Sequence, residues 1–148
     1  MEVIRATNNH IVELADLFNQ YRIFYKQVSD LKGAAAFLSV RLEHQQSILF
    51  IAVNQATGEA IGFTQLYPSF SSVSMKRSFI LNDLFVLEKH RGQGAAQLLL
   101  DHAKSYAKAN GAKGLELSTA MDNKQAQRLY ERNGYERDEM YYHYYLTI

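Results

Sequence analysis

The stretch Ile80–Leu100, which reads ILNDLFVLEKHRGQGAAQLLL, carries the strongest structural signal in the chain. An apolar strand leads into a short charged turn, and an apolar helix follows. Gly92 and Gly94 have no Cβ, so the backbone of the turn can adopt a positive φ and approach a ligand closely. The helix that we expect to begin near Gln93 would present unpaired N–H groups and the positive end of its dipole. The stretch is therefore a candidate anion site, although a plain strand–turn–helix connection would contain the same glycines.

Length and composition indicate one globular domain over residues 1–148. Apolar residues make up 47% of the chain and the net charge is +1, so nothing points to a nucleic-acid partner. The absence of cysteine excludes disulfides, thiolate metal sites and a cysteine nucleophile, and the five histidines lack metal-ligand spacing, so no metal is expected. Without a signal-peptide pattern or an apolar run of about 18 residues, we expect a cytoplasmic protein with no membrane partner.

Hydrophobic periodicity predicts a single succession of elements with no internal repeat or linker. Pro68 is expected to end one strand, residues 69–76 to form an exposed loop, and Asp122 to cap the last helix. The order indicates an α/β fold, a three-layer sandwich with one mixed, mostly antiparallel sheet and helices on both faces. The expected strands are 2–5, 47–53, 60–67, 77–87, 113–119 and 135–148, and the expected helices are 8–25, 33–44, 93–110 and 123–133.

The residues of the turn distinguish between classes of phosphate-binding loop. The turn has no GKS or GKT sequence, so it is not a P-loop, and it lacks the spacing of a dinucleotide fingerprint. It instead reads R-x-x-G-x-A, with Arg91, Gly94 and Ala96 at the defined positions. Downstream, DNKQAQRLYERNGY forms a second motif. With both motifs in this order, the chain resembles the GNAT N-acetyltransferase superfamily over nearly its whole length, and weaker features suggest its histone and polyamine branch.

The resemblance implies a fold, a co-substrate and a set of binding residues. The implied fold is the GNAT sandwich, and the implied co-substrate is acetyl-CoA. Backbone groups of Phe85 and Val86 would pair with the pantetheine arm, Asn123 would hydrogen-bond the coenzyme, and Ala126 would leave room beside it. The amides that would hold the pyrophosphate belong to Arg91, Gly92, Gln93, Gly94, Ala95 and Ala96. Arg91 has an alternative interpretation as a surface charge.

The resemblance also implies catalytic roles, which the residues alone leave open. Tyr130 would protonate the departing thiolate, but a core tyrosine on the same helix face would look identical. Relatives of the polyamine type carry an acidic pair where this chain has Asn82 and Asp83. Asp83 is therefore the candidate general base, with a structural carboxylate as the alternative, whereas Asn82 can only orient a water or the substrate. Because an amine can attack a thioester directly, no enzyme nucleophile is required.

We therefore expect an N-acetyltransferase that transfers an acetyl group from acetyl-CoA to a primary amine, in a ternary complex. The acceptor is a small-molecule amine or a protein lysine. The alternative is a non-catalytic coenzyme A-binding regulatory module, and a nucleotide-binding protein is a third interpretation. A homodimer is expected from the habit of the family and from the tyrosine-rich tail.

Overall fold

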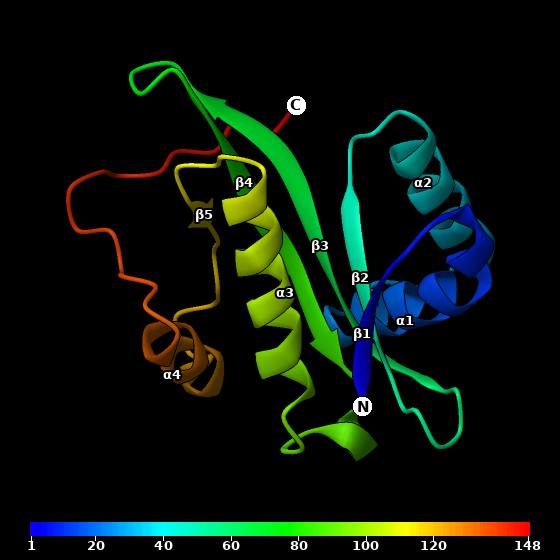
Figure 1. Cartoon of the computed structure of the whole chain (residues 1–148). Coiled ribbons are helices and arrows are strands. Elements are labelled where there is room, and N and C mark those ends of the chain that lie inside the picture. Colours follow the sequence, from blue (N-terminus) through cyan, green and yellow to red (C-terminus); the bar gives the residue numbers. More distant parts are fainter. The chain divides into compact units, whose positions relative to one another are not determined.

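The structure is a computed structural model that describes residues 1–148, and it separates into compact units at residues 1–117 and 118–148. We describe each unit by itself, and one domain over the whole chain stays a prediction. The second unit contains α4 (Lys124–Arg132). The first unit contains, in chain order (Figure 1), β1 (Glu2–Arg5), η1 (Asn8–His10), α1 (Ile11–Phe24), α2 (Leu31–Glu43), β2 (Ile48–Val53), β3 (Ala60–Ser71), β4 (Lys76–Val86), η2 (Glu88–His90), α3 (Ala95–Ala109) and β5 (Leu115–Glu116).

The sheet has the strand order β1-β2-β3-β4-β5, so strands that follow one another in the sequence lie next to one another in the sheet. The first three pairings are antiparallel, and β4 pairs with β5 in parallel. A parallel pair requires a crossover connection, and α3 provides it. The predicted mixed, mostly antiparallel sheet is confirmed.

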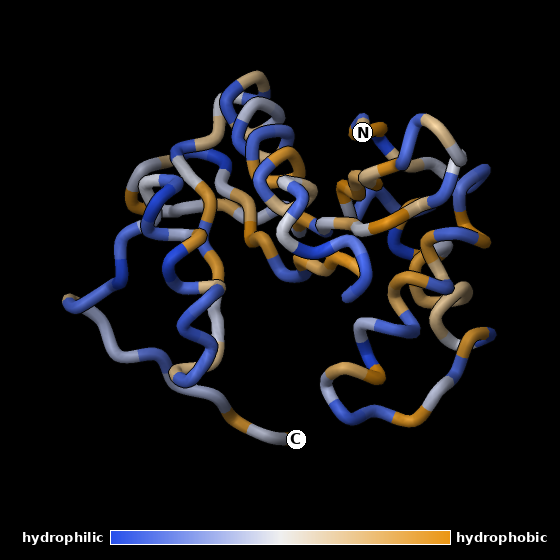
Figure 2. The backbone as a smooth tube through the Cα atoms, turned by 90° about the horizontal axis from the view of Figure 1, so that it is seen from below, coloured by the Kyte–Doolittle hydropathy of each residue, from blue (hydrophilic) through white to orange (hydrophobic).

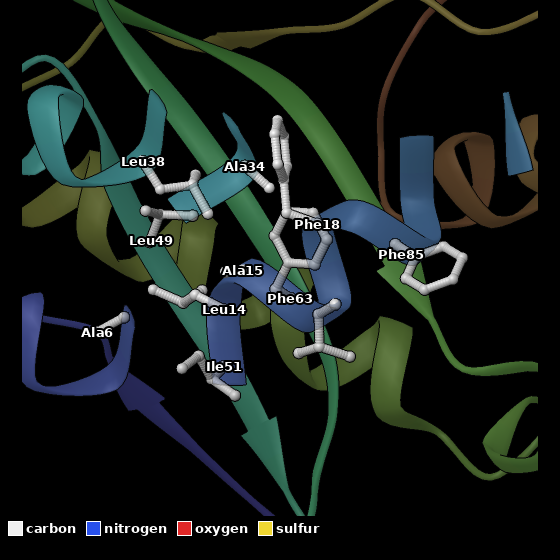
Figure 3. Packing of buried hydrophobic residues seen from close by; sticks show 11 residues of the cluster. Ala6, Leu14, Ala15, Phe18, Ala34, Leu38, Leu49, Ile51, Phe63 and Phe85 are labelled. Carbon is white, nitrogen blue, oxygen red and sulfur yellow. The ribbon is translucent and has the colours of Figure 1, made fainter. Parts of the chain in front are cut away.

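Alternate residues of β2 face opposite layers of helices, which gives the three layers. Leu49 and Ile51 belong to the core under α1 and α2, together with Phe18 and Phe63 (Figure 3). Phe50 points the other way and its ring lies 5.8 Å from that of Tyr106 on α3. Because the strand is buried on both faces, it reads as a continuous apolar run rather than as an alternating one. The predicted helices on both faces of the sheet are confirmed.

A one-residue bulge in β4 changes the face to which its side chains point. Gln65 pairs with Asp83, but Leu66 pairs with Leu81, so Asn82 is the extra residue. Before the bulge, Phe79 packs against Tyr106 of α3, with 5.5 Å between ring centroids. After it, Asp83 and the residues that follow alternate in the opposite frame, because a shift of one residue exchanges the faces of a strand. The bulge therefore turns Asp83 toward the α1 and α2 side.

The predicted loop over residues 69–76 and the predicted strand end at Pro68 are both wrong. β3 continues to Ser71 and pairs with β4 as far as Lys76, so most of the serine-rich segment is a hairpin. Pro68 is tolerated because the pairing of β3 with β2 ends at Leu66. Beyond Leu66 no strand pairs with β3 on the β2 side, so the N–H that Pro68 lacks removes no hydrogen bond to β2.

The remaining differences lie near and within residues 118–148. β5 comprises Leu115–Glu116 only, shorter than the predicted 113–119. Asn123, and not Asp122, caps α4. The predicted final strand over 135–148 is wrong, since this segment has no regular structure and its last residues are exposed. Its tyrosines have intermediate hydropathy, seen as the pale chain leading to the C end in Figure 2, so no alternation selects a buried face.

Candidate active site

Asp83 is a buried carboxylate at the centre of a side-chain hydrogen-bond network. Asp83 is only 3% exposed to solvent. Gln65 donates to its Oδ2 through Nε2, and Asn82 donates to its Oδ1 through Nδ2 at 3.0 Å. The hydroxyl of Tyr21 on α1 lies near the same carboxylate and lowers its pKa. The carboxylate is therefore held in one orientation by donors from β3 and β4.

A second set of contacts fixes Gln65 itself. Its Oε1 accepts from the Ser47 hydroxyl at 2.7 Å, so its Nε2 must face Asp83. The same Nε2 also lies 3.1 Å from the hydroxyl of Tyr67. Sequence reasoning missed Gln65 and Tyr67, and it gave Tyr21 no role beside Asp83. Gln65 offered a signal, because a polar residue inside the apolar run AIGFTQLY must find a buried partner.

In this network the neutral, protonated form of Asp83 is favoured more than it is for a carboxyl group in water. Burial raises the pKa of Asp83, and the hydrogen bonds from Gln65, Tyr21 and Asn82 lower it in part. Burial and then the nearby Asp83 charge raise the pKa of Tyr21, and the same causes bring the pKa of Tyr67 to about 12. The ion pairs of the chain lie elsewhere, so no cation of the protein is paired with Asp83. A carboxylate whose pKa is raised accepts a proton more readily than an ordinary one.

Asp83 borders a cavity of about 300 Å³ formed by α1, the segment after it, α2, β3 and β4. We call it the Asp83 cavity. Most of its lining is aromatic, and the rest is polar or charged. The aromatic members are Phe18, Tyr21, Tyr25, Phe37 and Tyr67, and the others are Arg22, Gln27, Asn82 and Asp83. A pocket that combines aromatic walls with a few polar groups and a buried carboxylate is a candidate ligand site.

The glycine loop, residues 91–96, has the backbone expected of an anion site. Gly92 and Gly94 have φ values of +73° and +89°, as predicted. α3 begins at Ala95 rather than at Gln93, with Gly94 as an N-cap that makes no side-chain hydrogen bond and with no acidic residue in the first turn. A Cβ at Gly92 or Gly94 would have no atom within 4 Å, so the space beside the loop is open. The loop therefore has the free backbone geometry and open space that an anion site requires.

Arg91 is an exposed residue whose guanidinium group is bound to the end of β4. Its Nε donates to the Val86 carbonyl at 3.0 Å, and its guanidinium lies 5.5 Å from the ring centroid of Phe24 and 5.8 Å from that of Phe85. Cation–π contacts of this kind stabilise the position of an arginine. Arg91 thereby fixes the start of the glycine loop relative to β4.

Phe85 and Val86 lie at the end of β4 beyond its pairing with β5. That pairing stops at Ile80 and Glu116, so residues 81–86 have no strand of this unit on that edge. Such an edge can accept an added extended chain. Both side chains are about nine-tenths buried, and the ring of Phe85 packs 6.4 Å from that of Phe63.

The other predicted site residues belong to the unit 118–148. Asn123 accepts a hydrogen bond at Oδ1 from the backbone N–H of Ala126 at 3.2 Å, which caps α4. Its amide group is a donor, and the cap uses only the oxygen. Tyr130 lies on α4, with its ring 5.8 Å from that of Tyr135. The structure thus gives Asn123 a helix-capping role that sequence reasoning had assigned to Asp122.

No helix is long and apolar enough to cross a bilayer. No group of three or more histidine, aspartate or glutamate side chains is arranged as a set of metal ligands.

Comparisons with known proteins agree with this geometry. Residues 11–135 match the acetyltransferase (GNAT) family. The chain is 54% identical over 148 residues to the uncharacterized N-acetyltransferase YhfO of Bacillus subtilis, covering all of this chain and 98% of that protein. It is 35% identical over 106 residues to a probable acetyltransferase of Haemophilus influenzae, covering 72% of each.

A solved structure supports the same assignment. The crystal structure of a probable acetyltransferase superimposes with a TM-score of 0.95 at 41% identity, covering 100% of this chain and 98% of that chain. The resemblance seen in the two sequence motifs is thereby confirmed over the whole length. The chain belongs to the GNAT acetyltransferase family.

Proposed function

We propose that the chain transfers an acetyl group from acetyl-CoA to a primary amine that enters the Asp83 cavity. The observation that carries the proposal is Asp83 itself, a buried carboxylate held by neutral donors and unpaired with any cation of the chain. An ammonium group would supply the missing counter-charge, and the carboxylate could then take its proton.

The energetic demand makes a base useful. An amine with a pKa near that of lysine, about 10.4, is almost fully protonated at pH 7, and freeing its lone pair costs about 4.6 kcal/mol. A buried carboxylate whose pKa is raised is a better proton acceptor than an exposed one, because its charged form is less stable. Asp83 would remove the proton of the bound amine directly or through one water.

Acetyl-CoA supplies the activated acetyl thioester. Of the residues of this chain, the amides of the glycine loop from Arg91 to Ala96 would hold its diphosphate at the N-terminus of α3. Phe85 and Val86 would offer backbone groups to the pantetheine arm along the open edge of β4. The Val86 carbonyl already accepts from Arg91, so its further pairing would be a shared one.

In the unit 118–148, we propose that Tyr130 protonates the leaving thiolate, that Asn123 donates its amide to the coenzyme, and that Ala126 leaves space beside it. These three roles follow from the family motif. They require no change in the cap of α4, because the cap uses only the Asn123 oxygen.

A thiol-release assay with acetyl-CoA and a panel of amines tests the proposal. We expect turnover with at least one amine, and a fall in kcat/KM of about 10²- to 10⁴-fold in Asp83→Asn, since general base catalysis contributes this much. Asp101→Asn is the matched control, because Asp101 is an exposed carboxylate on α3 that contacts only Gln97 among the hydrogen bonds described.

Two results would overturn the proposal. Binding of acetyl-CoA without turnover of any amine indicates a regulatory coenzyme A-binding module. Stronger thermal stabilisation by ATP or NAD than by acetyl-CoA indicates a nucleotide-binding protein. An unchanged kcat/KM in Asp83→Asn would leave acetyl transfer standing but remove the base.

A further inference from the structure

The Asp83 cavity contains two charges of opposite sign, and neither has a charged partner in the protein. Asp83 and Arg22 are the two charged side chains in its lining. The ion pairs of the chain join Glu59 to Lys89 and His90, Glu139 to Arg137, and Asp138 to His143. Both an anion and a cation are therefore left for a ligand to neutralise.

Arg22 is held at the cavity by the segment that follows α1. Its Nη1 donates to the Val28 carbonyl at 3.2 Å, and the Gln27 N–H donates to the Arg22 carbonyl at 2.9 Å. Lys26, with a φ of +63°, provides the turn that brings this segment back. A guanidinium has five N–H donors in a planar fork, so one bond to a carbonyl leaves enough donors to bind a carboxylate with two hydrogen bonds.

Most of the remaining wall is aromatic. The rings of Phe18, labelled in Figure 3, and Phe37 stack with centroids 5.7 Å apart, and those of Tyr21 and Tyr25 meet edge to face at 5.0 Å. Such a wall accepts an apolar group, and its ring faces also attract an ammonium. A cavity of about 300 Å³ lies at the small end of the range for ligand sites, which favours a compact molecule.

From this juxtaposition we propose that the amine acceptor also carries a carboxylate, and that it is a free amino acid with an apolar side chain. Arg22 binds the carboxylate and selects for it, Asp83 faces the amine, and the aromatic wall contacts the side chain. The inference rests on the acetyl transfer proposed above. The amine nitrogen forms a C–N bond to the acetyl carbon, the C–S bond breaks, and the proton given up by the amine is balanced by the proton gained by the released thiol.

The test compares each amino acid with its own amide, which keeps the amine and side chain but removes the negative charge. Thiol release is measured for phenylalanine and phenylalaninamide and for leucine and leucinamide. Spermidine and a lysine peptide represent the other classes of acceptor. The proteins are the unmodified chain, Arg22→Gln, Arg22→Lys and the control Lys26→Gln, which removes a positive charge from the neighbouring turn.

We expect Arg22→Gln to raise KM for the amino acids by roughly tenfold or more, the effect of losing a hydrogen-bonded charge pair, with kcat and the KM for the amides unchanged. Arg22→Lys keeps the charge without the fork, so its KM should lie between the two. Lys26→Gln should leave both substrate classes unaffected. Thermal denaturation of each variant separates these effects from misfolding.

Several outcomes would overturn the inference. These are an equal effect of Arg22→Gln on acids and amides, or a higher kcat/KM for spermidine or the lysine peptide than for any amino acid. If no amine is acetylated, the proposed function fails, and calorimetric titration of phenylalanine then decides the inference alone. Binding that is lost in Arg22→Gln supports it, and absence of binding refutes it.

Discussion

The glycine loop and Asp83 lie within one short stretch of chain, yet the protein builds the loop and the Asp83 cavity in opposite ways. The loop consists of consecutive residues and acts through its backbone, with Gly92 and Gly94 at positive φ and Gly94 as the cap of α3. The cavity consists of side chains from α1, α2, β3 and β4, which meet only when the sheet and helices pack. A backbone site can therefore be recognised from a few residues, whereas a side-chain site depends on the whole fold.

The largest effect that separates the two regions is expected from Gly94→Ala. In this variant the alanine must hold a φ of +89°, and its Cβ projects into the space beside the loop. We expect KM for acetyl-CoA to rise by about tenfold or more, with the Asp83 cavity intact, because the backbone can no longer approach the diphosphate. Steady-state kinetics with varied acetyl-CoA measure this.

Gly111→Ala is the matched control. Gly111 has a φ of +68° and open space around it, but it follows the other end of α3. Both substitutions should lower the free energy of unfolding by about 1–2 kcal/mol through the same backbone strain. An equal rise in KM for acetyl-CoA in both variants would mean that the loop effect is only strain.

The next effect concerns the cavity and depends on pH. Because burial raises the pKa of Asp83 in the folded state, its contribution to stability is complete below the unfolded pKa of about 3.9. That contribution is lost as the pH rises through the folded pKa. Relative to Asp83→Asn, which does not titrate, the free energy of unfolding should fall with rising pH from about pH 4 upward, by at most about 1.4 kcal/mol per pH unit.

Urea denaturation of both proteins between pH 4 and 8 measures this difference. The other carboxyl groups titrate in both proteins and cancel in the subtraction. A difference that rises with pH would show that the carboxylate is stabilised by its hydrogen bonds more than it is destabilised by burial.

The smallest effect concerns Asn123, where a local backbone role and a proposed ligand role fall on one side chain. Asn123→Ala should cost about 1 kcal/mol through loss of the α4 cap, whereas Asn123→Ser keeps a capping oxygen and should restore most of that stability. If both variants raise KM for acetyl-CoA and only the alanine variant is less stable, the amide binds the coenzyme. If KM follows stability in both, Asn123 acts only as a cap. Chemical denaturation and steady-state kinetics provide the two readings.

What the sequence could predict follows the same division. The order of elements as far as α4, the mixed sheet and the positive φ values of the glycine loop depend on local signals such as periodicity and glycine, and these were confirmed. The strand end at Pro68 was predicted wrongly because the cost of a proline depends on whether a neighbouring strand is present, and β2 has already ended there.

The cavity was harder to predict for the same reason. Asp83 was a candidate base, but its partners Tyr21 and Gln65 are distant in sequence and are brought to it by strand register and by the packing of α1. Arg22 was not singled out, since an arginine on an amphipathic helix looks like any solvated charge. The tail was predicted as a strand because the tyrosines of residues 141–145 have strand propensity, and propensity alone does not provide a partner.

The bulge at Asn82 has a consequence for how this site can change. It divides β4 into two parts. Before the bulge, Phe79 packs against Tyr106 of α3, and after it, Asp83 borders the Asp83 cavity on the other face of the sheet. The position of the carboxylate thus depends on the number of residues before it, and exchanging one amino acid for another cannot alter that number. Across divergent sequences, point substitutions can tune the chemistry of the cavity, but a single insertion or deletion in this strand would relocate the carboxylate to the opposite side of the sheet.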